Sequence, residues 1–168
     1  MGEWKHNEWR EKLRTKPARY WIRDEIEEII KQEKIDRTRF YEYSKFGYEE
    51  IINRFYYAFV DHENRPKVEL AYCWLKFREE LKVLDRIREG DDWIAFLQEI
   101  HSRMPETEDD KFYMILSEGW VYEGYAEEIF AVLNEVDCVL EDFYIVSRKF
   151  NWFVSYCTDA GSAMIFQK

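Results

Sequence analysis

The run from Phe143 to Tyr156, FYIVSRKFNWFVSY, restricts the possible folds more than any other part of the sequence. Its first half is rich in β-branched and aromatic residues, which suit a pleated, half-buried surface. Asn151 marks a polar turn, after which side chains again alternate between two faces as they do along a strand. A second turn at 158–162 and a short apolar run at 163–166 follow. The pattern predicts an antiparallel meander of three strands.

The residues before this run read mainly as helices. Helical periodicity, with apolar side chains recurring on one face, is clearest over 20–34, 48–60, 93–104 and the residues after Tyr125 up to Val136. Asp92 offers a capping side chain to the third of these helices. Residues 68–88 fit one long helix, although their apolar first part, 68–77, fits a strand equally well. The aromatic stretch at 40–47 is predicted to be a turn.

A further strand is predicted at 111–117, with residues 119–122 continuing it through a bend. The resulting order at the C-terminal end is strand, helix, strand, strand, strand. N-terminal helices followed by a mostly antiparallel sheet place the chain in the α+β class. The chain has 168 residues, of which 46% are hydrophobic. We therefore expect a single domain, 1–168, either alone or with residues 1–16 as an N-terminal helical arm.

Several classes of protein are disfavoured by composition. No apolar run approaches the ~20 residues that cross a bilayer, and the N-terminus lacks the apolar core of a secretory signal. The three cysteines, Cys73, Cys138 and Cys157, are odd in number and far apart, which argues against a disulfide framework. We therefore predict a cytoplasmic protein that does not bind membranes.

Motifs for metals, cofactors and catalysis are equally weak. The three histidines are scattered, and no pair has the close spacing of a metal site. The glycines are spread singly, so a glycine-rich phosphate loop is absent from the sequence. No serine or cysteine lies in a nucleophile motif. The sequence thus predicts no catalytic residue, no metal and no cofactor; the alternative is a small enzyme that uses carboxylates or Cys157 in a cleft.

The charge distribution is the strongest physical clue. The formal net charge is −10, and residues 104–142 hold twelve acidic side chains against the single Lys111. An acidic field repels nucleic acid and anionic membranes and attracts basic partners. Its simplest alternative is a solvated surface that keeps the protein soluble. The N-terminal segment, by contrast, mixes bases with aromatics; it either stacks on RNA or docks on the protein's own acidic half, and we favour docking.

From these charges we predict a surface that binds a basic protein partner. Its carboxylates come from the acidic loop and from the helix that follows it. Two aromatic residues between them are the predicted apolar anchors, because tryptophan and tyrosine often anchor interfaces. The predicted partner-binding residues are Glu106, Glu108, Asp109, Asp110, Trp120, Tyr122, Glu123, Glu127 and Glu128. The sequence does not determine the partner or the oligomeric state.

The C-terminal meander also carries a family resemblance. Part of the meander is similar to the C-terminal signature of a bacterial family of small α+β proteins. The matching residues are the triplet Tyr144-Ile145-Val146, the basic-aromatic pair Lys149-Phe150, and Trp152 at the start of the next strand. Upstream, residues 120–124 resemble that family's approach to its helix, and residues 21–28 resemble its N-terminal helix. The tail after Cys157 departs from the family pattern, because Thr158-Asp159-Ala160-Gly161 contains no histidine.

The resemblance implies a binding function and no catalytic activity. Such proteins resemble immunity proteins of polymorphic toxin systems, which bind and neutralise a cognate toxin domain. The predicted function is therefore that of a non-enzymatic binding protein, which neutralises a basic toxin such as a nuclease through its acidic surface. Any role tied to the missing histidines is not carried over. A structural or regulatory adaptor is the other alternative.

Overall fold

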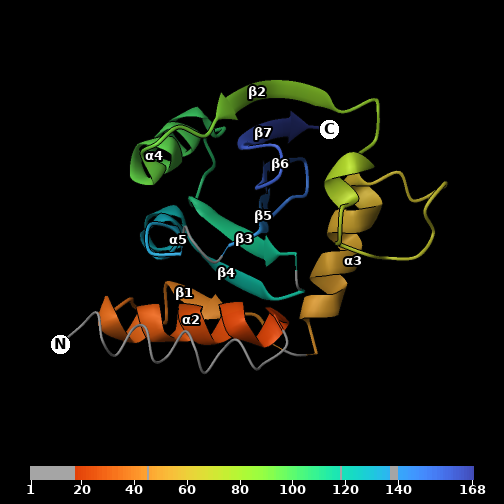
Figure 1. Cartoon of the computed structure of the whole chain (residues 1–168). Coiled ribbons are helices and arrows are strands. Elements are labelled where there is room, and N and C mark those ends of the chain that lie inside the picture. The colour runs from red at the N-terminus through yellow and green to blue at the C-terminus, as the bar shows by residue number, and fades with distance from the viewer. Residues whose placement is uncertain (1–17, 45, 118, 137–139) are drawn as a thin grey trace.

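A computed structural model of the protein describes residues 18–44, 46–117, 119–136 and 140–168. Within these residues the chain forms four α-helices and one seven-stranded antiparallel sheet (Figure 1), which confirms the predicted α+β class. The predicted arm at 1–16 and most of the basic N-terminal segment lie outside the described residues. The division into one domain with an arm therefore stays a prediction.

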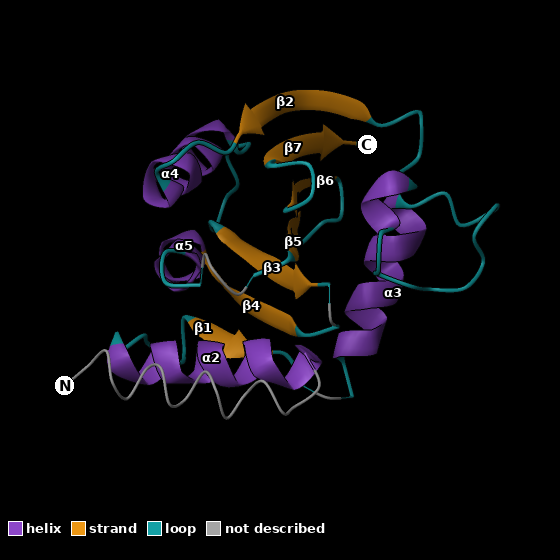
Figure 2. Ribbon diagram, viewed as in Figure 1, coloured by secondary structure: helices purple, strands orange, loops and turns teal. Residues whose placement is uncertain are grey.

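The helices alternate irregularly with the strands along the chain (Figure 2). The helices are α2 (Ala18–Gln32), α3 (Tyr48–Phe59), α4 (Trp93–Arg103) and α5 (Ala126–Leu133), with a short 3₁₀ helix, η1, at Cys73–Leu75. The strands are β1 (Phe40–Glu42), β2 (Lys82–Arg88), β3 (Lys111–Leu116), β4 (Val121–Tyr125), β5 (Asp142–Ser147), β6 (Trp152–Cys157) and β7 (Ser162–Gln167). Their spatial order is β1-β4-β3-β5-β6-β7-β2, which leaves β1 and β2 at the edges.

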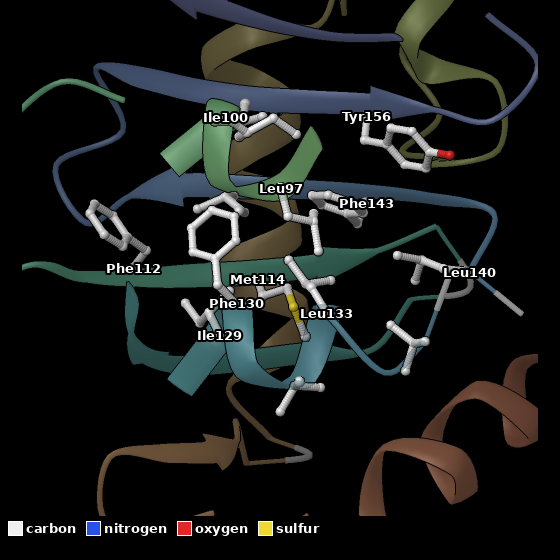
Figure 3. Close-up of a cluster of buried hydrophobic side chains, with 14 of the residues drawn as sticks. Leu97, Ile100, Phe112, Met114, Ile129, Phe130, Leu133, Leu140, Phe143 and Tyr156 are labelled. Carbon is white, nitrogen blue, oxygen red and sulfur yellow. The ribbon is translucent and has the colours of Figure 1, made fainter. Parts of the chain in front are cut away.

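One face of the sheet is covered by α2, α4 and α5. Figure 3 shows Leu97 and Ile100 of α4 and Ile129 and Leu133 of α5 over the same face of the sheet, and all four lie in one buried cluster with the strands. The amphipathic pattern of these helices explains the packing, because each turns an apolar stripe toward the sheet. Asp92 caps α4 as predicted, since its Oδ1 accepts a hydrogen bond from the backbone N–H of Ala95 at 3.1 Å.

The opposite face is covered by α3 and by residues from the segment between α3 and β2 (Figure 1). Its core is aromatic: the ring centroids of Phe59 and Phe153 are 4.3 Å apart, and those of Phe55 and Tyr144 are 4.9 Å apart. Aromatic pairs at this spacing add stabilisation beyond their buried area. Because both faces are covered, β5 and β6 are apolar on both sides, which is why residues 143–156 are so hydrophobic.

The predicted C-terminal meander is confirmed as β5, β6 and β7, and the predicted helices correspond to α2, α3, α4 and α5. The long helix predicted at 68–88 was wrong. Residues 68–77 form a loop with η1 rather than a helix or a regular strand, and residues 82–88 form β2, which pairs with β7. Pairing with a distant strand here overrides the local helical spacing.

Two shorter predictions are also corrected. Residues 40–42, predicted as part of a turn, form β1 and pair with β4. Residues 119–122 do not continue β3; the chain reverses at Gly119, whose φ of +100° suits glycine, and β4 returns antiparallel beside β3. These pairings place the end of β4 next to the start of β3, which positions the acidic residues described below.

Candidate protein-binding site

The acidic loop at 105–110 lies at one end of the sheet and meets the start of α5. Lys111, the first residue of β3, pairs with Tyr125, the last residue of β4. The backbone N–H of Ala126 then donates a hydrogen bond to the carbonyl oxygen of Asp110 at 2.9 Å. The structure therefore brings together the two sequence segments from which the predicted carboxylates come.

Five of the predicted carboxylate residues are exposed at this end of the sheet. We call them the acidic edge, and they are Glu106, Glu108, Asp109, Asp110 and Glu127. The Glu127 side chain is 85% exposed and its carboxylate lies 4.0 Å from the guanidinium of Arg39. Exposed ion pairs of this kind contribute little to stability, so Glu127 can exchange Arg39 for another cation at little cost.

Basic side chains of the β5–β6 turn stand beside the acidic edge. Together they line a pocket of about 550 Å³, to which the edge contributes three carboxylates and the turn contributes Arg148 and Lys149. Arg148 Nη1 lies 2.7 Å from Asp109 Oδ2. Sequence reasoning missed these two bases, because only the pairing of β3 with β5 brings the turn to the loop. The edge is therefore acidic but partly neutralised at Asp109.

Glu123 is buried and belongs to an internal ion pair. Its side chain is 8% exposed, and its Oε1 lies 3.0 Å from Lys111 Nζ and 4.0 Å from Arg148 Nε. Hydrogen bonds with Tyr41 and with Glu123 raise the pKa of the Lys111 ammonium. A carboxylate held in this way supports the sheet and is not part of the exposed surface.

Glu128 also forms an ion pair within the protein. Its carboxylate accepts a hydrogen bond from Nε of Arg39, its side chain is only 12% exposed, and this bond raises the pKa of the Arg39 guanidinium. The Arg39 guanidinium also lies over the ring of Tyr125 at 4.1 Å. Glu128 thus ties α5 to the segment before β1 instead of facing a partner.

The two predicted aromatic anchors differ in position. Tyr122 is fully buried, and its ring stacks on that of Phe40 with the ring centroids 5.1 Å apart. The prediction that Tyr122 is a surface anchor was therefore wrong. The cause is that both faces of the sheet are covered, so both Tyr122 and its neighbour Val121 on the other face are buried. Trp120 is partly buried against the same core, with the guanidinium of Arg23 at 5.5 Å from its ring. Neither residue joins the acidic edge.

The enzyme alternative depends on the surroundings of Cys157 and of the side chains that could bind a metal. Cys157 is buried, and burial raises the pKa of its thiol, which disfavours the nucleophilic thiolate. Over the described ranges, no three histidine, cysteine or acidic side chains come together in a way that would hold a metal ion. In the same part of the chain, no helix is both long enough and apolar enough to span a membrane.

The fold and the acidic edge define an α+β protein with one antiparallel sheet between two covering layers and a charged surface at one end. The chain belongs to a family of unknown function, DUF6756, whose model matches residues 18–168. Comparison with curated proteins and with solved structures finds no match.

Proposed function

We propose that the protein is a non-enzymatic binding protein of the immunity type, which neutralises a basic toxin in the cytoplasm through its acidic edge. The observation that supports this proposal is the contact between the acidic loop and the start of α5, which gathers five exposed carboxylate residues at one end of the sheet. Glu123 and Glu128 are left out, because internal cations already neutralise them.

Electrostatics explain how such an edge acts. A net charge of −10 attracts a basic protein from a distance, and exposed carboxylates at the contact accelerate docking and set its dependence on salt. The neighbouring bases Arg148 and Lys149 add selectivity, because a partner must carry a charge pattern that suits both signs. The edge is therefore better suited to one cognate surface than to any cation.

The test captures the partner from the source cells with the tagged protein, at low and then at raised salt, and identifies it by mass spectrometry. We expect one basic protein that raised salt releases. A triple variant, Glu106→Lys with Glu108→Lys and Glu127→Lys, should weaken its binding by roughly tenfold or more at low salt. Asp110 is kept, because its φ of +54° is, among residues other than glycine, tolerated best by aspartate or asparagine.

A matched control carries the same charge change elsewhere. Glu63, Glu69 and Glu79 are exposed residues in the loops between α3 and β2, so their triple replacement by lysine should leave binding nearly unchanged. Equal retention of the partner by both triple variants would remove the acidic edge from the proposal.

Neutralisation is tested separately by expressing the captured partner with and without the wild-type protein. An immunity role requires that the partner alone stops growth and that co-expression restores it. A captured partner that is harmless on its own would contradict the immunity role and favour the adaptor alternative.

A further inference from the structure

A second, larger pocket of about 750 Å³ lies over β6, β7 and β2, on the face of the sheet that α3 covers elsewhere. The aromatic cluster under α3 reaches this region through Phe77 and Phe166, which form its wall. Beyond them β6 carries Ser155 and Cys157, β7 carries Ser162, and the turn between β6 and β7 contributes Ala160 and Gly161. The face is hollow there because these side chains are short.

Strand register fixes the floor of this pocket. Ser155 of β6 pairs with Met164 of β7, which pairs with Arg86 of β2. The next row on the same face is Cys157, Ser162 and Arg88. Directly opposed residues of antiparallel strands point to the same face, so the two arginines stand side by side at the outer edge of the pocket.

Among the described residues, no carboxylate lies within ion-pair distance of either guanidinium group; the hydrogen bond that Arg86 donates to the carboxylate of Asp85 comes from its backbone N–H. The contact found for Arg86 runs from its Nη2 to the sulfur of Met164 at 3.7 Å. Glu89 also lines the pocket, and its Oε2 accepts a hydrogen bond from the hydroxyl of Tyr156 at 2.8 Å. The two arginines and Glu89 together leave a positive charge. In a chain with 35 acidic and 25 basic side chains, unpaired neighbouring arginines point to an anion from outside.

The segment around η1 adds an apolar surface and an unpaired donor to the pocket. Trp74 and Leu75 of η1 line the pocket next to Phe77, and Leu75 is 58% exposed. The indole Nε1 of Trp74 is buried and has no hydrogen-bond partner within the described part of the chain. A buried donor without an acceptor is costly, and the indole that carries it belongs to a residue lining the pocket.

We propose that this pocket binds a small organic carboxylate with an apolar body. The carboxylate pairs with Arg86 and Arg88, because guanidinium groups match the two oxygens of a carboxylate. The apolar body lies against Trp74, Phe77 and Met164. The volume falls in the range of about 300–1,000 Å³ that is usual for small-molecule sites. This site goes beyond the proposed function, since it uses other strands, the opposite charge and a different class of ligand.

The experiment follows the indole N–H resonance of Trp74 in protein labelled with ¹⁵N, assigned with the variant Trp74→Phe. The probes are octanoate and 3-phenylpropionate, compared with neutral 3-phenylpropanol and with inorganic phosphate. We expect a saturable shift with the carboxylates and roughly tenfold weaker binding of the alcohol and of phosphate. No shift with either carboxylate would overturn the proposal, and so would an alcohol or phosphate that binds as tightly.

Paired variants then locate the charge. Calorimetry with 3-phenylpropionate should show roughly tenfold or greater loss of affinity for Arg86→Gln with Arg88→Gln. The control, Lys67→Gln with Lys82→Gln, removes two exposed cations outside the pocket and should bind like the wild type. All four residues are exposed, so circular dichroism is expected to show folded protein in both cases. Wild-type affinity in the arginine variant would exclude the site, whatever the outcome at the acidic edge.

Discussion

Two buried tyrosines differ in what their hydroxyl groups contact. The hydroxyl of Tyr56 donates to the backbone carbonyl of Arg65 at 3.0 Å. The hydroxyl of Tyr122 is buried and has no hydrogen-bond partner among the described residues, and burial raises its pKa. An orphaned buried hydroxyl costs free energy, whereas a paired one is roughly neutral or favourable.

Tyr122→Phe should therefore leave the free energy of unfolding unchanged or raise it by about 1 kcal/mol, because it removes only the orphaned hydroxyl and keeps the ring on Phe40. Tyr56→Phe is the matched control and should lower it by about 1 kcal/mol, since Arg65 loses a donor. Urea unfolding measures both. A greater loss in Tyr122→Phe than in Tyr56→Phe would mean that the Tyr122 hydroxyl has a partner.

Asp142 at the start of β5 should make stability depend on pH. Burial raises the pKa of its carboxyl above the ordinary 3.8, and the charges of Asp159 and Glu141 add to this. A raised pKa in the folded state gives a stabilising contribution that is complete below 3.8 and is lost as pH rises through the folded value. At neutral pH the charged, partly buried carboxylate is therefore unfavourable.

Asp142→Asn removes that charge and can keep the hydrogen bond from the backbone N–H of Thr158. We expect a higher melting temperature than the wild type at about pH 7, and convergence at about pH 3. Asp36→Asn is a control of opposite sign, because hydrogen bonds from Thr38 lower the pKa of Asp36 and stabilise its charged form. Thermal melts at both pH values test this expectation. It would be refuted if Asp142→Asn were less stable than the wild type at neutral pH.

The pairing of β1 with β4 depends on a glycine. Gly124 lies opposite Phe40, and a Cβ added there would lie 2.8 Å from the carbonyl oxygen of Arg39 and 3.1 Å from Cα of Phe40. Both are backbone atoms, so the strands would have to separate.

Gly124→Ala should thus lower the free energy of unfolding by about 1–3 kcal/mol, the usual cost of overpacking. Gly90→Ala is the control and should be nearly neutral, because a Cβ at Gly90 meets no atom within 4 Å. Chemical denaturation compares the two. Equal stability of the two alanine variants would show that β1 is not held closely against β4.

At the scale of elements, the sequence predicted what depends on local spacing. The helices and the meander of β5, β6 and β7 follow from apolar periodicities of 3.6 and 2 residues, which are visible within a short window. The prediction for segment 68–88 was wrong because it also relied on local spacing. That spacing resembles a helix, whereas β2 exists only through its hydrogen bonds to β7. Strand β1, three residues long, carries too short a pattern to recognise.

The whole molecule carries a large net negative charge, and its negative side chains repel one another in the compact state. The formal net charge is −10, and added salt screens such repulsion. We expect the melting temperature to rise when sodium chloride is increased from about 0.01 M to about 0.3 M. The triple lysine variant of the acidic edge moves the formal net charge from −10 to −4 and should respond less. A wild-type melting temperature that falls with salt would mean that attractive ion pairs dominate.

The sequence by itself determined the α+β class, most helices, the C-terminal meander and the position of the acidic loop, because each depends on residues close together in the chain. Only the tertiary structure decided which acidic side chains remain exposed. The side chains of Glu123 and Glu128 are only 8% and 12% exposed and pair with Lys111 and Arg39, whereas that of Glu127 is 85% exposed and lies at the limit of ion-pair distance from Arg39. The arginine pair of β2 likewise became a site only through the register of β2 with β7, since strand pairing joins residues that the chain itself holds far apart.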